Sequence, residues 1–332
     1  FFRPWVIWNR NYDVAPEASI RFVKGLWNHQ IRDHNTGNFD QLAEYRRHGP
    51  GSNRQSPRHG GYYISLWADA YQQTQDDLYI QAIETLVGLY ERHRSEKSGA
   101  IPEAIGRSWL EGVLFPQSNL SLAVDLWNAS DVMPDELAKR MRKCAAQTDE
   151  MFLKLTHSPE DTMKGFVIQA DAKTLKAVDV REMCKPVYSH LWLTEGRGNS
   201  HAQMANLCML RYKQNQNDAY KKLILEASQS YFDVNLAKDD PVYPETFGHI
   251  IWLMLNVYEI TDEAKYLEKA KYFAAQAVDL FLSNGTGLPS ASSKHHLYEA
   301  ITRGDTLMMA LLKLYAVENE KSSKVSLMWC DR

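Results

Sequence analysis

Residues 61–90 read GYYISLWADAYQQTQDDLYIQAIETLVGLY, and this stretch sets the pattern for most of the chain. An apolar segment ends in Tyr71, a short polar turn follows, and a second tyrosine, Tyr79, opens another apolar segment. The same arrangement returns in residues 201–227 and 249–274, where the two tyrosines are again eight residues apart. Such self-similarity indicates repeated units of supersecondary structure. Each unit is predicted to be a hairpin of two helices.

The two helices of a hairpin differ in polarity. Residues 250–255 are IIWLML, apolar on every side, which predicts burial all round, whereas the following helix carries Lys265 and Glu268 on a polar face. Buried inner helices surrounded by amphipathic outer ones predict an all-α fold, an (α/α)6 toroid whose sixth hairpin lacks its outer helix. A helical solenoid would hold a stricter period. The toroid is predicted to span residues 1–320, and residues 321–332 alternate like a strand that begins another module.

Composition excludes several classes of protein. The 332 residues carry 38 basic and 41 acidic side chains, a net charge of −3, and show no basic stripe for nucleic acid. The sequence contains no run of about eighteen apolar residues, the length that would predict a membrane-spanning helix. The four cysteines are scattered, which predicts neither a disulfide framework nor a zinc motif. The sequence does not specify an oligomeric state.

Polar side chains precede or begin each predicted inner helix. In a toroid these segments converge on one mouth of the central cavity, so we expect them to form the functional site. Capping explains small polar residues at helix starts, but basic residues gain nothing where the helix dipole favours anions. The candidate catalytic residues are His59, His201, Tyr243, Glu245 and His249. The candidate substrate-binding residues are Arg58, Tyr62, Asn119, Arg197, Asn199, Trp252, Tyr298 and Glu299.

Arginine and histidine outnumber carboxylates in these segments, which favours an acidic glycan as the substrate. The main prediction is therefore a lyase that cleaves by β-elimination next to a uronic acid. Elimination needs a group that neutralises the carboxylate, a base that removes the C5 proton and an acid that protonates the leaving oxygen. The residues suited to these tasks are, in that order, Arg58, Arg197 and Asn199; His59, His201 and His249; and Tyr62, Tyr243 and Tyr298.

Other functions remain open at this point. An inverting glycoside hydrolase needs two carboxyl groups about 6.5–9.5 Å apart, and Glu245 with Glu299 or Asp305 would supply them. No cofactor is required, although a divalent metal assembled from different hairpins would use His249 and His295. The third alternative is a toroid related to sugar 2-epimerases, or one that binds glycans without catalysis.

The repeat and its polar residues resemble the α/α-toroid carbohydrate-active enzymes, which include toroid polysaccharide lyases, unsaturated glucuronyl hydrolases and N-acylglucosamine 2-epimerases. The resemblance covers almost the whole chain and concerns architecture. The catalytic set of the toroid lyases is matched in type and place by Arg197, Asn199, His201 and Tyr243. The acidic pairs expected after the histidines of an epimerase are missing after His201 and His249. The resemblance implies a secreted or periplasmic enzyme that degrades an acidic glycan.

Overall fold

The computed structural model describes residues 8, 10–39, 55–105, 110–180, 186–193, 199–234, 240–283 and 285–319. Within these ranges it contains eleven α-helices and four short strands, and none of the described helices is long and apolar enough to cross a membrane. The chain divides into two compact units, residues 1–155 with 169–179 and residues 156–168 with 180–332. The tail predicted for residues 321–332 lies outside the described ranges. A single toroidal domain over residues 1–320 stays a prediction.

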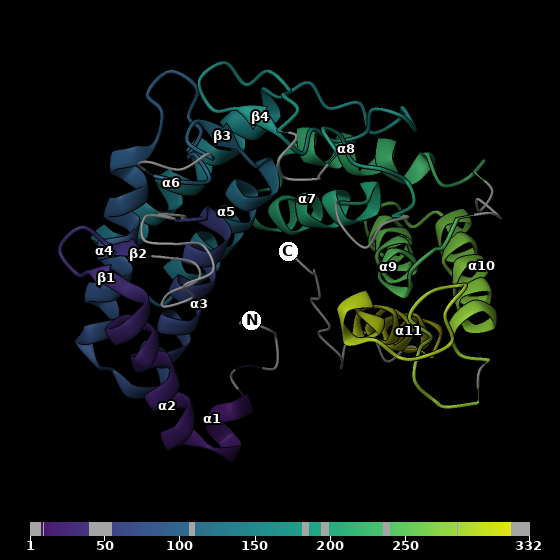
Figure 1. The fold of residues 1–332 in the computed structure, drawn as a ribbon, viewed down its shortest axis with the longest axis horizontal. Coiled ribbons are helices and arrows are strands. Elements are labelled where there is room, and N and C mark those ends of the chain that lie inside the picture. The colour runs from purple at the N-terminus through teal and green to yellow at the C-terminus, as the bar shows by residue number, and fades with distance from the viewer. Residues whose placement is uncertain are drawn as a thin grey trace. The chain divides into compact units, whose positions relative to one another are not determined.

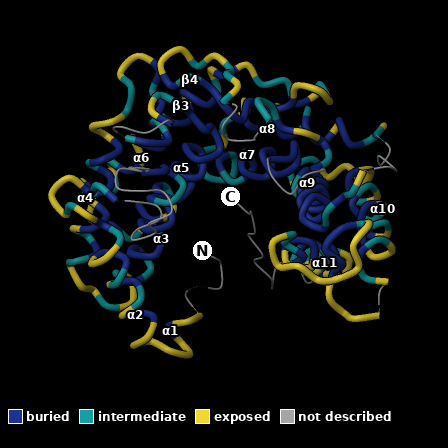
Figure 2. Tube along the Cα trace, viewed as in Figure 1, coloured by how far each residue is buried: buried dark blue, intermediate teal, exposed yellow. Residues whose placement is uncertain are grey.

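The first unit contains two helical hairpins and two small antiparallel sheets, β1–β2 and β3–β4 (Figure 1). Its elements are α1 (Arg10–Val14), α2 (Pro16–Gly25), the π-helix η1 (Leu26–Gln30), β1 (Ile31–Asp33), β2 (Asn38–Phe39), α3 (Pro57–Thr74), α4 (Asp77–His93), β3 (Val113–Leu114), α5 (Pro116–Ser130), α6 (Asp135–Leu153) and β4 (Ala170–Asp171). Helices α3 and α5 pack against each other along their length, and α4 and α6 cover them. Almost every residue of α5 is buried, whereas α4 alternates buried and exposed positions (Figure 2).

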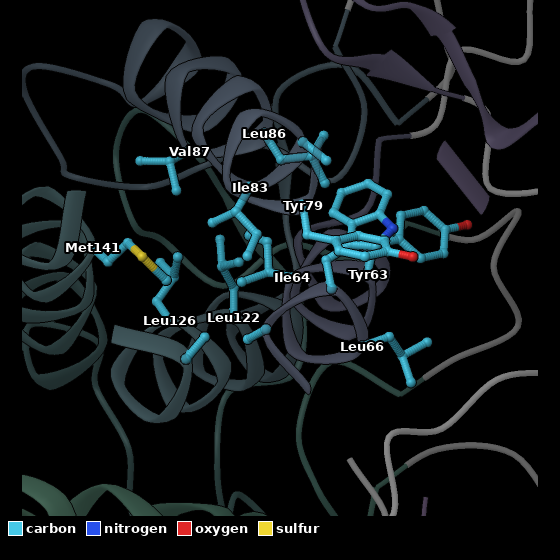
Figure 3. Close-up of a cluster of buried hydrophobic side chains, with 14 of the residues drawn as sticks. Tyr63, Ile64, Leu66, Tyr79, Ile83, Leu86, Val87, Leu122, Leu126 and Met141 are labelled. Carbon is cyan, nitrogen blue, oxygen red and sulfur yellow. The ribbon is translucent and has the colours of Figure 1, made fainter. Parts of the chain in front are cut away.

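The apolar core of this unit lies between the four helices, as Figure 3 shows. Ile64 from α3, Ile83 and Leu86 from α4, and Leu122 from α5 are all fully buried. Burying an aliphatic side chain of this size contributes about 1.5–3 kcal/mol, so such clusters stabilise the helix pairs. The apolar faces predicted from the sequence are therefore buried between the four helices.

The second unit contains the remaining helices. They are α7 (His201–Asn215), α8 (Asp218–Gln229), α9 (Pro244–Thr261), α10 (Ala264–Phe281), the 3-10 helix η4 (Ala300–Thr302) and α11 (Gly304–Glu318). Helix α9 packs against α7, α10 and α11, and it is buried from Pro244 to Leu255. The inner helix is thus the apolar one, as predicted.

The hairpin turns are alike in three of the repeats. Each inner helix is followed by a residue with positive φ, namely Gln75 (56°), Gln216 (53°) and Asp262 (57°). In the first two hairpins the next residue caps the outer helix: Asp76 accepts a hydrogen bond from the Leu78 amide, and Asn217 accepts one from the Ala219 amide. A left-handed residue closes one helix and an Asx side chain starts the next. This shared turn is why the tyrosines keep their spacing of eight.

Candidate active site

Three polar side chains meet at the start of α9 in the second unit. Glu245 lies in the first turn of α9, His249 lies one turn later on the same face, and Arg303 lies just before α11. The Arg303 Nη1 donates to Glu245 Oε1 at 2.6 Å, and His249 Nε2 is 3.7 Å from that oxygen. Glu245 is 8% exposed and His249 is 1% exposed. We call these three residues the Glu245 cluster.

The local sequence explains how the Glu245 cluster forms. Pro244 begins α9, because proline is suited to a first helical position, and an acidic residue is favoured in the first turn. A Cβ added to Gly248 would lie 2.7 Å from the carbonyl carbon of Thr306, so the glycine allows α11 to approach α9 closely. Arg303 itself has φ 55° and ends the short helix η4. This approach places its guanidinium over the Glu245 carboxylate.

The charges of the Glu245 cluster are interdependent. A buried carboxylate is costly unless it is paired, so the guanidinium stabilises Glu245 in its charged form. Neither ring nitrogen of His249 has a hydrogen-bond partner among the described residues. A neutral imidazole has one ring nitrogen that accepts a proton. The cluster therefore combines a fixed negative charge with a proton acceptor.

Hydrogen bonds of two side-chain amides fix the position of α9 along α7. Asn206 on α7 donates from Nδ2 to the main-chain oxygen of His249 at 2.8 Å, and its Oδ1 accepts from Asn256 Nδ2 at 3.0 Å. Asn206 is 2% exposed. Buried amides that are bonded on both sides hold one relative position of two helices. They therefore hold His249 in place.

Other predicted residues of the α9 and α11 region lie in different surroundings. Tyr243 is half-buried immediately before α9. Tyr298 and Glu299 are exposed on the segment that leads into Arg303, with Tyr298 47% exposed. Trp252 is only 3% exposed and lies in the packed interior of the unit, and its contact with a sugar stays a prediction.

The metal alternative gains no support from the described residues. They contain no group of three or more His, Cys, Asp or Glu side chains placed to hold a metal ion. His249 is buried in α9, whereas His295 is exposed on the loop before η4. The two histidines do not form a site together in this part of the chain.

His201, predicted as a catalytic base, is enclosed. Its Nδ1 lies 3.0 Å from Ser189 Oγ and its Nε2 lies 3.3 Å from the Asp161 main-chain oxygen, and the residue is fully buried. A Cβ on Gly165 would overlap the His201 ring, so the turn at Gly165 packs directly on the imidazole. Burial lowers the pKa of His201 below its usual value, although hydrogen bonds to main-chain groups oppose this. We therefore assign His201 a structural role and leave it out of the proposed catalytic set.

Asn199 is also occupied within the protein. It is 3% exposed, and its Nδ2 donates to Gln203 Oε1 at 2.9 Å. Arg197, which was predicted to bind substrate beside it, lies outside the described residues. The candidate lyase set of Arg197, Asn199, His201 and Tyr243 is thus not assembled by the described part of the chain.

The first unit holds a separate group of predicted residues in the first two turns of α3. The guanidinium carbon of Arg58 lies 6.0 Å from the centre of the Tyr62 ring, and the His59 ring lies 5.9 Å from it. We call these the Arg58 cluster; Arg58 and His59 are half-buried, while Tyr62 is 4% exposed. The cluster brings a guanidinium, an imidazole and a phenol ring together at the start of α3.

Asn119, on α5, does not join the Arg58 cluster as a ligand-binding side chain. It is fully buried, and its amide accepts from the Ile101 amide at 3.0 Å and donates to the Ile101 oxygen at 2.9 Å. Both polar ends of the side chain are used to hold the loop before α5. These two hydrogen bonds give Asn119 a structural role, and its contact with substrate stays a prediction.

The pairing of Arg303 with Glu245 was missed by sequence reasoning. The sequence did contain a signal for Arg303. Like the other candidate residues, it lies immediately before a predicted inner helix. The sequence could not show that α11 lies against the first turn of α9.

Comparison with solved structures identifies the fold. An unsaturated glucuronyl hydrolase specific for heparin matches 95% of this chain and 84% of its own at 16% identity, with a TM-score of 0.52. A D-mannose isomerase matches 93% of this chain and 84% of its own at 13% identity, with a TM-score of 0.62. The chain has the α/α-toroid fold of these structures. A GH76 α-mannanase from Bacteroides thetaiotaomicron also matches, over 96% of this chain and 85% of its own at 11% identity, with a TM-score of 0.55.

These matches confirm the predicted fold class and show a structural likeness to the toroids of carbohydrate-active enzymes. The structures named are two hydrolases and an isomerase, and no lyase is among them. No protein-family profile matches the chain, and no curated protein matches it by sequence. At these identities the likeness concerns the fold, and the reaction has to be argued from the site.

Proposed function

We propose that this chain is a glycoside hydrolase in which Glu245 acts as a catalytic carboxylate. The observation that carries the proposal is the Glu245 cluster: a buried carboxylate held at 2.6 Å by Arg303, with the His249 imidazole beside it. Glu245 and His249 were both predicted to be catalytic, and their side chains lie 3.7 Å apart. Buried ionisable groups that lie beside one another are common components of acid–base sites.

The roles follow from the charges. Because Arg303 stabilises the carboxylate form, Glu245 is suited to be the general base that takes a proton from the attacking water. An inverting hydrolase then needs a protonated carboxyl group on the other side of the bond, about 6.5–9.5 Å away. Glu299 and Asp305, on either side of Arg303, are exposed and are the candidates for this acid.

The proposed substrate carries a uronic acid. Arg303, beside Glu245 in the second unit, carries a guanidinium at the start of an inner helix, and guanidinium groups bind carboxylates through several N–H donors. Two of the similar structures are unsaturated glucuronyl hydrolases, which supports the same substrate class. We further propose that the protein acts on glycans outside the cytoplasm.

A sugar isomerase or epimerase is the second candidate, on one specific observation. His249 is buried beside a carboxylate with neither ring nitrogen hydrogen-bonded within the described residues. An imidazole in that state can remove a proton next to a sugar carbonyl. The similar structures also include a D-mannose isomerase and a cellobiose 2-epimerase. Lyase chemistry is less well supported, because His201 is enclosed.

A product analysis separates the three reactions. The protein is incubated with uronate-containing oligosaccharides and with free aldoses, and the products are followed by reducing-end assay, ultraviolet absorbance and NMR. Hydrolysis predicts new reducing ends without absorbance near roughly 235 nm, the region where an unsaturated uronate absorbs. Absorbance that rises with the reducing ends would show elimination instead. A changed aldose without bond cleavage would show isomerisation.

A further inference from the structure

Helix α11 exposes one apolar side. Like the inner helix α9 it consists mostly of apolar residues, but α9 is covered by α7, α10 and α11, whereas α11 packs mainly against α9 within the described residues. Met308, Leu312 and Tyr315 are 36%, 52% and 55% exposed. Spacings of four and three residues place these side chains on one side of the helix. An inner helix whose hairpin lacks an outer helix, as the sequence predicts for the sixth, is expected to have such a side.

The segment that leads into α11 adds to this surface. Residues 294–301 are all exposed, and the exposed segment before α11 is visible in Figure 2. It lies at the start of α11, because the Ser293 amide donates to the Val242 oxygen just before α9 at 2.9 Å, and α9 and α11 begin side by side. We call the exposed apolar side chains of this segment and of the helix the α11 patch: Leu297, Tyr298, Ile301, Met308, Leu312 and Tyr315.

The α11 patch concentrates exposed apolar surface in one place. It holds six of the eleven large apolar side chains that are exposed in the described ranges. Their exposures, from 36% to 80%, together equal between three and four whole side chains, which is roughly 600 Å². Specific protein interfaces bury about 600–1,000 Å² on each partner. Apolar patches of this size often mark interaction sites, because burying apolar surface drives association.

The order of the side chains on α11 suits a second copy of the same helix. Leu312 lies near the middle of the exposed side, with Met308 one turn before it and Tyr315 one turn after it. When two copies of α11 pack antiparallel about a two-fold axis at Leu312, Met308 of each copy meets Tyr315 of the other. Methionine sulfur makes favourable contacts with aromatic rings. The surface is therefore complementary to itself.

Charge is compatible with the antiparallel arrangement. The start of α11 has the exposed side chains Lys294 and Asp305 nearby, and its end has Glu318 paired with Lys271 at 3.2 Å. Both ends thus carry charges of both signs, so the arrangement brings no like-charged ends together. It also places the positive end of each helix dipole beside the negative end of the other, whereas a parallel pair would place like ends together.

We propose that the α11 patch is the interface of a homodimer, in which two copies of α11 pack antiparallel around Leu312. The patch includes residues on both sides of Arg303 in the chain, so the second copy lies beside the Glu245 cluster. The inference does not depend on which reaction that cluster performs, because it concerns a surface outside it.

The test measures the oligomeric state by sedimentation velocity over a range of micromolar concentrations. Wild type is expected to form a dimer. Leu312→Lys is expected to raise the dissociation constant by about a hundredfold or more, because it places a charge at the centre of an apolar interface, with circular dichroism unchanged since Leu312 is exposed in the monomer. The matched control is Met163→Lys, which puts the same charge on an apolar side chain that is 78% exposed and lies outside the patch. This control is expected to dimerise like wild type.

Cross-linking tests the arrangement within the dimer. Under mild oxidation Leu312→Cys is expected to give a disulfide-linked dimer that wild type does not give, since Cys144 and Cys208 are buried. A dimer without this cross-link would overturn the packing around Leu312. Wild type that is monomeric at every concentration, or Leu312→Lys that dimerises as wild type does, would overturn the proposal.

Two results would assign the patch to another occupant and would also overturn the proposal. A disulfide between the introduced thiol and Cys330 of the same chain would show that the C-terminal residues of the chain cover it. Monomeric wild type that sediments with anionic phospholipid vesicles, when Leu312→Asp does not, would show that the patch binds a lipid surface.

Discussion

Replacing Gly248 by alanine tests the contact that assembles the Glu245 cluster. The added Cβ would lie 2.7 Å from the Thr306 carbonyl carbon and 2.8 Å from the Leu307 nitrogen, whereas ordinary contacts begin at 3.4 Å. These are backbone atoms, so no side-chain rotation relieves the overlap, and α11 has to withdraw by several tenths of an ångström. Overpacking of this kind costs about 1–3 kcal/mol. The same substitution gains about 1 kcal/mol of helix propensity.

Gly88 is the matched control because it also lies inside a helix, α4. Its added Cβ would meet only the ends of flexible side chains, Arg92 Nη1 at 3.1 Å and Arg140 Nη2 at 3.9 Å. Gly88→Ala is therefore expected to keep the propensity gain of about 1 kcal/mol. The two variants should differ by the steric cost of about 1–3 kcal/mol, with Gly248→Ala the less stable.

Urea unfolding and amide exchange in the substituted helix measure both variants. Gly248→Ala is also expected to lose activity in its folded fraction, since withdrawal of α11 moves Arg303 away from Glu245. If Gly248→Ala is stabilised as much as Gly88→Ala, the close packing of α9 on α11 is wrong. The account of how the site forms would then be refuted as well.

Three further predictions concern single residues. Arg303→Lys keeps the charge but loses the planar fork, so kcat/KM is expected to fall by about tenfold or more in a protein whose circular dichroism is unchanged; unchanged kinetics would contradict the pairing with Glu245. Asn119→Ala leaves two buried main-chain groups of Ile101 without partners, so the free energy of unfolding in urea is expected to fall by about 2–4 kcal/mol. An unchanged free energy of unfolding would contradict this structural role. Because burial lowers the pKa of His201, wild type is expected to lose stability as pH falls below 6.5, and His201→Gln should flatten that dependence; equal slopes would argue against a buried neutral imidazole.

The fold could be predicted from the sequence because its repeat has a local cause. Tyr71 and Tyr79 keep their spacing since Gln75 and Asp76 form a turn that needs no distant contact. The apolar residues 250–255 likewise identify an inner helix from composition alone. Helix period and turn chemistry are both properties of neighbouring residues.

The site could be predicted only in part, because burial depends on segments far apart in the chain. Glu245 and His249 lie one turn apart on one helix, so their proximity follows from spacing. His201 occupies an equivalent place at the start of α7, yet Gly165 and Ser189 enclose it. The sequence gives no measure of that enclosure, nor of the approach of α11 that brings Arg303 to the site.

The kcat of Glu245→Gln on a uronate-containing oligosaccharide tests the central claim most directly. The variant is measured once the product analysis has identified a substrate that wild type cleaves, and circular dichroism confirms that it is folded. Glutamine keeps the size of the side chain but cannot exchange a proton, and loss of a general acid–base group costs about 10²–10⁴-fold in rate. We predict a fall in kcat within that range. A kcat within about threefold of wild type would contradict the assignment of Glu245, and with it the proposed catalytic role of the Glu245 cluster.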